Sequence, residues 1–311
     1  MQLKALPILT LSGSLFLAAC GGSSPFIEPR EVESEDEAAA PEPTVTTAIP
    51  ASLAGNVASF TFVPESGGTP GTVTIELDAL DSSSVTATYV RNAALDIGKY
   101  QAYTFQERAE TRHYTMLGAE SEDGSVLAGV VADGGQFNRY FGGGHYERSG
   151  TYTHPTTGQV TYAGDYAAVT NVNGDGTQLI STSLDPSVQP SQAGRISGTI
   201  TIIAEFSSNR VNGEIYNRVL NPGEAGEETG LANVVLVDGT IATDGSFEGD
   251  AETIDQVDIG NYGGIFGTNA DSVAGVVRLT EWDTARNGEE EYGAFVLEAC
   301  DGSATDDPAC P

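Results

Sequence analysis

The stretch GGIFGTNADSVAGVVRL, residues 263–279, decides the fold class of this chain. Apolar residues lie on both sides of a short Asn-Ala-Asp segment, and glycines interrupt them. The stretch lacks the Gly-Lys-Ser/Thr ending of a phosphate-binding loop, which argues against a nucleotide site. We interpret it as a corner between two strands, in which Thr268 or Asn269 caps a single helical turn and Gly275 lets the chain come close to the next strand.

The chain around this corner also consists of short strand-like segments separated by turn residues, with no long amphipathic helix. Residues 195–206 place Ile196, Ile200 and Ile202 on one face and Thr199 and Thr201 on the other, with Ile203 as the exception. Residues 211–219 alternate in the same way, with Val211, Ile215 and Val219 on one face and Glu214, Tyr216 and Arg218 on the other. Such alternation is typical of strands with one buried face.

A hairpin is predicted over residues 234–251, because Asp244-Gly245 suits a two-residue turn in which both central residues need φ > 0. Further strands are predicted at 158–169 and 291–299. Roughly eight strands between residues 150 and 300 are enough to close a barrel. Their outward residues are polar, the reverse of a membrane barrel. We therefore predict an all-β protein with a soluble antiparallel eight-stranded β-barrel; a β-sandwich is the alternative.

An N-terminal β unit is predicted before the barrel, and the glycine-rich segment 138–148, NRYFGGGHYER, joins the two. Its strand-like segments are 73–80, 84–91, 100–107, 113–121 and 126–134. The predicted organisation is a signal peptide at 1–20, a tether at 21–50, the β unit at 51–147 and the barrel at 148–311.

The N-terminus predicts a lipid anchor. A short apolar stretch ends in Leu17-Ala18-Ala19-Cys20, which resembles a bacterial lipobox whose cysteine is lipidated; an ordinary signal peptide is the alternative. Gly21, in place of Asp, favours the outer membrane. Residues 21–50 hold seven acids, one Arg and five prolines, so we expect a disordered tether.

Composition excludes several partners. The chain has 13 Lys and Arg against 44 Asp and Glu, a net charge of −31. It has no basic patch to neutralise phosphates, which excludes nucleic acid and argues against an anionic membrane surface.

Cys300 and Cys310 are predicted to form a disulfide, because exported proteins with paired cysteines usually do; two free thiols are the alternative. Closing this loop with a disulfide would add roughly 2–3 kcal/mol to the free energy of unfolding.

The opening stretch resembles a recurring element of the transferrin-binding protein B family of bacterial surface lipoproteins. In that family a strand ends in Gly-aromatic-aromatic-Gly and meets a Pro-Asn-Ala-acid-Glu turn, and Gly-Gly and the next strand follow. The matching residues here are Gly264, Phe266, Gly267, Asn269, Ala270, Asp271 and Gly275. Thr268 replaces the usual Pro, and Ser272 stands where an acid is common. The resemblance implies a "handle" β domain followed by an eight-stranded barrel on a lipid anchor, here with one lobe.

Several chemical sites are candidates. Residues 138–148 gather Tyr140, Phe141, His145 and Tyr146, which could bind a protein or ligate haem iron, or could pack where handle meets barrel. Residues 171–179 resemble a calcium loop through Asn171, Asn173, Asp175 and Thr177, but the twelfth position is Thr182 rather than Glu; a plain turn is the alternative.

The usual enzyme motifs are absent from the sequence, including Gly-x-Ser-x-Gly, His-Glu-x-x-His, Cys-x-x-Cys and Gly-x-Gly-x-x-Gly. We therefore predict a non-enzymatic, lipid-anchored binding protein at the surface of a Gram-negative outer membrane, which captures an iron source, haem or a host protein. The alternatives are a structural or assembly lipoprotein of the outer membrane without a small ligand and, more weakly, a carboxylate-based hydrolase.

Overall fold

A computed structural model describes residues 44–45, 48–78, 85–300 and 309–310, all of which lie in one compact unit, Glu42–Pro311. Cys20 and the rest of the predicted lipobox lie outside these residues. The helical segments are α1 Ala51–Ala54, η1 Ala93–Leu95 and η2 Pro186–Val188. The handle strands are β1 Thr44–Val45, β2 Val57–Val63, β3 Thr72–Leu77, β4 Val85–Arg91, β5 Gln101–Phe105, β6 Tyr114–Glu120, β7 Val126–Asp133 and β8 Gly142–Ser149. The barrel strands are β9 Gln159–Asn173, β10 Ala193–Glu205, β11 Arg210–Leu220, β12 Glu228–Leu231, β13 Val234–Ile241, β14 Ser246–Thr253, β15 Asp258–Phe266, β16 Ser272–Thr280 and β17 Glu290–Ala299.

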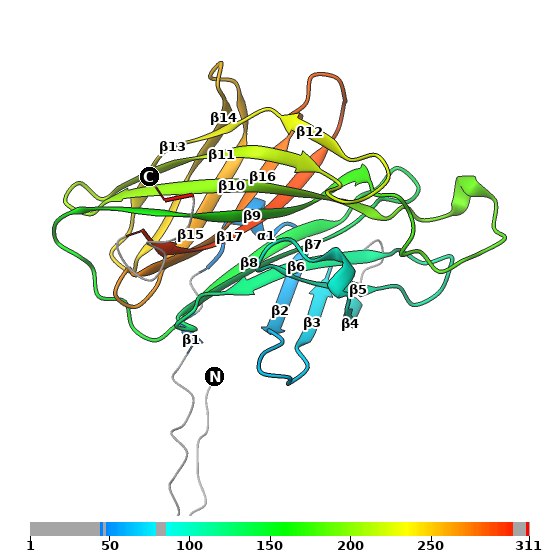
Figure 1. The fold of residues 1–311 in the computed structure, drawn as a ribbon, viewed down its shortest axis with the longest axis horizontal. Helices are drawn as coiled ribbons and strands as arrows, with labels where there is room; N and C mark the ends of the chain where they lie inside the picture. The colour runs from blue at the N-terminus through cyan, green and yellow to red at the C-terminus, as the bar shows by residue number, and fades with distance from the viewer. Residues whose placement is uncertain (1–43, 46–47, 79–84, 301–308, 311) are drawn as a thin grey trace, which may run out of the picture. The chain divides into compact units, whose positions relative to one another are not determined.

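The second sheet closes into a barrel of eight antiparallel strands (Figure 1). Its strands run in the order β10-β9-β17-β16-β15-β14-β13-β11, and β10 pairs with β11 to complete the ring. The short β12 pairs only with β11. The predicted all-β class and the predicted antiparallel eight-stranded barrel are therefore confirmed.

Side chains fill the barrel interior. Phe266 contacts Tyr162, Phe206 and Phe247, with ring centroids 5.0–5.6 Å apart. These rings form one buried cluster with inward aliphatic residues of the barrel strands, such as Ile200, Val211 and Leu236. An eight-stranded barrel is just wide enough for its own side chains, so this interior is a packed core.

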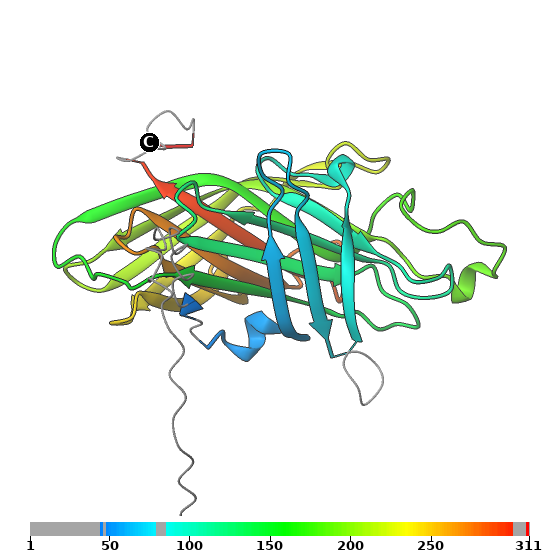
Figure 2. The ribbon, with the colours of Figure 1, turned by 90° about the horizontal axis from the view of Figure 1, so that it is seen from below.

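The handle is an antiparallel sheet in which β2 to β8 follow one another in chain order, and β1 pairs with β8 (Figure 2). β1 lies within the segment that the sequence predicts as a tether. Its backbone pairs Thr44 with Ser149 and Val45 with Arg148, so ordered structure begins before residue 51.

Handle and barrel share a buried apolar cluster. Leu53 of α1 and Val130 of β7 pack in the same cluster as Val276 of β16 and Val296 of β17. β8 comes especially close, because a Cβ added to Gly144 would lie 2.6 Å from Val276 Cγ1. The contact explains why the three glycines at 142–144, which the sequence analysis places in a joining loop, form part of strand β8 instead.

Two turn predictions are wrong in detail. In the hairpin turn only Gly245 has positive φ, at 79°, and Asp244 accepts a hydrogen bond from Ser246 N at 3.0 Å. The corner at 267–271 contains no helical turn and no side-chain cap from Thr268 or Asn269. Ala270 N donates to Gly267 O at 3.1 Å, and Ala270 has φ 59°. A β-turn reverses the chain here, because the two flanking strands pair directly up to Phe266–Val273.

The outward placement of Arg218 is also wrong. Tyr216 pairs with Thr199 and Val219 with Ser197, so Asn217 and Arg218 together lie opposite Gly198. Such a bulge adds one residue and reverses the alternation that follows. Arg218 is thereby fully buried, where it forms an ion pair with Glu291, and Glu291 also accepts a hydrogen bond from Tyr166 at 2.7 Å.

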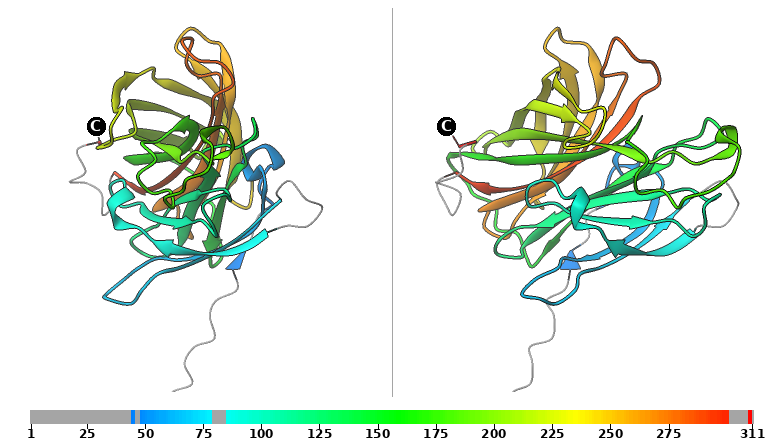
Figure 3. Two further views of the ribbon diagram at one scale, coloured as in Figure 1. Left: turned by 90° about the vertical axis from the view of Figure 1, so that its right-hand side faces the viewer. Right: turned by 45° about the vertical axis from the view of Figure 1, so that its right-hand side comes forward.

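Consecutive barrel strands run antiparallel, so the connecting segments alternate between the two ends of the barrel. Most segments at one end are longer than those at the other. We call the end formed by segments 174–192, 221–233, 254–257 and 281–289 the long-loop end. We call the end formed by segments 206–209, 242–245 and 267–271 the short-turn end. Figure 3, left, shows the ring of strands from the long-loop end, and Figure 1 shows the green 174–192 segment reaching beyond the strands.

Candidate functional site

The turn between β7 and β8 carries an exposed phenylalanine in an uncommon backbone conformation. Gln136 and Arg139 exchange two backbone hydrogen bonds, of 3.0 and 3.1 Å. Between them Phe137 and Asn138 both have φ 56°. The left-handed region costs a bulky residue roughly 1–2 kcal/mol, whereas Asn tolerates it. Phe137 is nevertheless 62% exposed, so the conformation brings no burial of the ring.

A buried ion pair holds this turn from beneath. Arg112 pairs with Asp133, and its guanidinium also donates to the backbone oxygens of Gln136 at 2.8 Å and Arg139 at 2.9 Å. Asp133 in turn accepts from Phe141 N at 2.9 Å. Burial raises the pKa of Asp133, and the charge of Arg112 opposes that rise. Removing one partner of such a pair costs about 3–5 kcal/mol, so the turn is firmly anchored.

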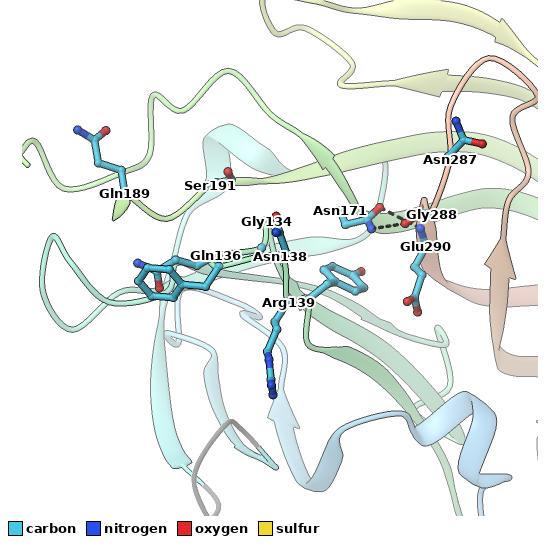
Figure 4. A pocket seen from close by; sticks show the side chains of 13 residues that line it. Gly134, Gln136, Asn138, Arg139, Asn171, Gln189, Ser191, Asn287, Gly288 and Glu290 are labelled. Atoms are coloured by element: carbon cyan, nitrogen blue, oxygen red, sulfur yellow. Dashed lines mark hydrogen bonds between the residues drawn. The ribbon is translucent and has the colours of Figure 1, made fainter. Parts of the chain in front are cut away.

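An open hollow of about 570 Å³ lies beside the turn, at the long-loop end (Figure 4). The turn reaches this end through Ser191 N, which donates to Gly135 O at 3.0 Å. Asn171, at the end of β9, donates to Gly288 O at 2.8 Å and accepts from Glu290 N at 2.9 Å. These bonds tie the wall of the hollow to the loop before β17. The lining amides are Gln136, Asn138, Asn171, Gln189 and Asn287.

Tyr140 lines the hollow from the handle side. Its ring stacks on Tyr292 of β17, with centroids 6.5 Å apart. Its hydroxyl is buried without a hydrogen-bond partner in the described part of the chain, and burial raises the pKa of this phenol. An unpartnered buried hydroxyl costs stability, and this oxygen is closed off from solvent.

The four residues predicted as a ligand site do not converge. Phe141 packs under the turn, 4.7 Å from the Arg112 guanidinium. His145 stacks on Phe60 at 5.2 Å, whereas Tyr146 is 2% exposed and lies in the cluster between handle and barrel. Consecutive residues of a strand face opposite sides, so His145 and Tyr146 do not fit a shared haem iron.

Phe137 is the residue that the sequence analysis missed. Gly134-Gly135 before it and Asn138 after it are turn residues between two strands, which is the signal that could have placed it at an exposed tip.

The residues predicted to bind calcium all make hydrogen bonds within the protein. Asn171 bridges to the loop before β17, and the Asn173 carbonyl accepts from Asn221 at 2.8 Å. Asp175 accepts from the amide and hydroxyl of Thr177 at 3.0 and 2.7 Å, which lowers the pKa of Asp175. These bonds are those of an Asp-initiated turn. We derive no function through calcium.

The predicted disulfide between Cys300 and Cys310 is present, with Cα atoms 5.5 Å apart. Across the described ranges, no group of three or more His, Cys, Asp or Glu side chains is arranged to hold a metal ion. Among the helices of those same ranges, none has the length and apolar character needed to cross a membrane.

Comparison with known families identifies the barrel. Residues 154–296 match the family model described as the C-lobe and N-lobe beta barrels of Tf-binding protein B. The barrel of this chain is similar to the barrels of that family. The resemblance predicted from residues 263–279 is thereby confirmed for the part of the chain that holds β9 to β17. A comparison with curated proteins found no match.

Solved structures with low similarity include transferrin-binding protein B chains. Intact Ap-TbpB, with N and C lobes, is 11% identical over 73% of this chain and 52% of that chain, with a TM-score of 0.37. A double mutant from Haemophilus parasuis is 12% identical over 74% and 50%, with a TM-score of 0.36. A mutant from Actinobacillus pleuropneumoniae is 16% identical over 79% and 99%, with a TM-score of 0.35. The chain spans about half the length of the first two proteins.

Proposed function

We propose that this chain is a lipid-anchored, non-enzymatic binding protein at the surface of a Gram-negative bacterium, where it captures a host protein. The observation that carries the proposal is Phe137, an exposed aromatic ring that a buried ion pair holds in a left-handed turn. Exposed, strained residues cluster at functional sites, and aromatic residues dominate the energetics of protein interfaces.

The arrangement of the chain supports capture at the long-loop end. β1, where the described structure begins, pairs with the Arg148–Ser149 end of β8. Arg148 donates to Asp244 O at 2.9 Å and Phe266 O at 3.0 Å, both at the short-turn end. β1 therefore meets the barrel at the end away from the Phe137 turn.

The family suggests the first partners to test. The similar solved structures are named for transferrin binding, and residues 154–296 match a model of the barrels of Tf-binding protein B. A protein partner fits better than haem bound directly, because His145 and Tyr146 face opposite sides of β8. The net charge of −31 further favours a partner with a basic surface, whose approach it would accelerate at low salt.

Whole cells that produce the full chain provide the test. Cells with the native protein should bind iron-loaded transferrin or haemoglobin, each offered separately with a fluorescent label. Cells that lack the chain should not. If native cells bind neither protein above that background, while antibody staining shows the chain at the surface, capture of these host iron proteins is refuted.

The anchor is tested separately. Cys20→Ser should move the chain from the membrane fraction to the soluble fraction and abolish labelling by a fatty-acid probe, because the thiol is the only group available for lipidation at the predicted cleavage site. The neighbouring change Gly22→Ser should leave both unchanged. Membrane retention of Cys20→Ser at the native level would contradict the anchor.

A further inference from the structure

The hollow beside Phe137 is neutral in a chain that is strongly acidic. Of its thirteen lining residues, five carry amides and only two, Arg139 and Glu290, carry charge. Glu290 is already paired with Arg278 at 3.1 Å. The chain as a whole has a net charge of −31, so acids are conspicuously few here. A single Arg is a poor site for an anion in that field, and a hollow without free carboxylates is a poor site for a cation.

Several polar groups of the hollow are not engaged by the protein. Within the described ranges, the side chains of Asn138, Asn287 and Ser191 make no hydrogen bond to the protein. Amides and hydroxyls each offer donors and acceptors. Their best counterparts are groups that also donate and accept, and alcohol hydroxyls do both.

Phe137 adds an apolar surface to this polar wall. The exposed ring stands at the edge of the hollow, next to Asn138 and Gln136. The face of an aromatic ring carries partial negative charge and attracts weakly positive C–H groups. A pyranose ring has one face of C–H groups and a rim of hydroxyls, which matches an aromatic face beside the free amide of Asn138.

We propose that this hollow binds a neutral saccharide, with one pyranose ring over Phe137 and its hydroxyls on the neighbouring amide of Asn138. The inference rests on the proposed function, because the saccharide that binds in the hollow is then part of a glycan on the captured host protein. Acidic sugars are excluded by the charge of the chain. The open form of the hollow suits the end of a longer glycan.

The test uses the full chain without its lipid and a panel of neutral disaccharides: lactose, maltose, cellobiose, chitobiose and mannobiose. Saturation-transfer NMR should detect at least one of them, and calorimetry should then give its affinity. Asn138→Gly removes one amide while glycine accepts the φ of 56°. It should weaken binding about two- to tenfold, the effect of one hydrogen bond.

Asn209→Gly is the matched control. Asn209 has φ 55°, is exposed and lies at the short-turn end, so the same substitution in the same conformation should leave sugar binding unchanged. A second arm compares transferrin before and after enzymatic removal of its glycans. Loss of capture after their removal would identify the protein-borne glycan as the source. Unchanged capture, with disaccharide binding intact, would identify a free saccharide.

If no disaccharide binds, or if Asn138→Gly binds as tightly as the native chain, the saccharide site is refuted. Capture of glycan-free transferrin in that case would leave the proposed function standing. Failure of both transferrin and haemoglobin to bind, with disaccharide binding retained, would instead refute the proposed function and leave the hollow as a saccharide site.

Discussion

His113, directly before β6, is buried and 2% exposed, and its Nδ1 atom has no hydrogen-bond partner among the described residues. Burial lowers the pKa of His113 to about 4. The unfolded chain binds a proton near pH 6.5, the ordinary histidine value, whereas the folded chain does not. Stability is therefore lost as the pH falls from about 6.5 to about 4, by roughly 3 kcal/mol in total.

His113→Phe should remove the loss of stability that protonation of His113 causes at low pH. The free energy of unfolding, measured by urea titration at a series of pH values, should fall less steeply for His113→Phe than for the native chain in that window. Above pH 7 the two curves should run parallel, because the histidine is neutral in both states. Parallel curves down to about pH 4 would contradict a buried neutral histidine at this position.

Single residues also show where prediction from the sequence stops. The inward positions of β10 follow from alternation alone, and the isoleucines at 196, 200 and 202 are buried as expected. Arg218 departs from this alternation because Asn217, with φ 53°, adds a residue opposite Gly198. Bulge positions are set by pairing with the neighbouring strand, and the local sequence of β11 does not specify them.

Strand β8 shows the same limit for a whole element. Three consecutive glycines predict a loop, since glycine destabilises a strand. Here the missing side chains are what allow the element to pack: Gly143 lies against Ala54 O, and Gly144 lies against Val276. The other handle strands from β3 to β7 carry Val, Tyr and Thr and are predicted correctly from residues 73–134.

Gly144→Val should therefore weaken the contact of handle and barrel. A side chain there would meet both Cγ atoms of Val276 within 2.7 Å, so one of the two sheets must shift. We expect a loss of about 1–3 kcal/mol, the usual cost of overpacking. Urea denaturation measures it, with Ser149→Val as a control on the exposed end of the same strand. Equal stability of both variants would show that the contact is loose.

For the molecule as a whole, the barrel could be predicted and the site only in part. Alternation, turn residues and the motif at 263–279 are local patterns, so they specify the strands of the barrel. The hollow depends on segments far apart in the chain, around residues 137, 171, 190 and 288, which only the closed fold brings together. The sequence therefore predicts Tyr140 as a residue of the site, but it does not predict the amides from distant segments that form the rest of the wall.

The proposed function places partner binding at the long-loop end of the barrel, at the Phe137 turn. The most direct measurement is the affinity of immobilised native chain, Phe137→Gly and Asn209→Gly for transferrin and for haemoglobin by surface plasmon resonance. Phe137→Gly should weaken binding about tenfold or more, as expected for an aromatic contact at the centre of an interface. Its unfolding temperature should not fall, since glycine adopts φ 56° without strain. Asn209→Gly should bind like the native chain. Native affinity in Phe137→Gly, or binding of neither protein by the native chain, would contradict the claim.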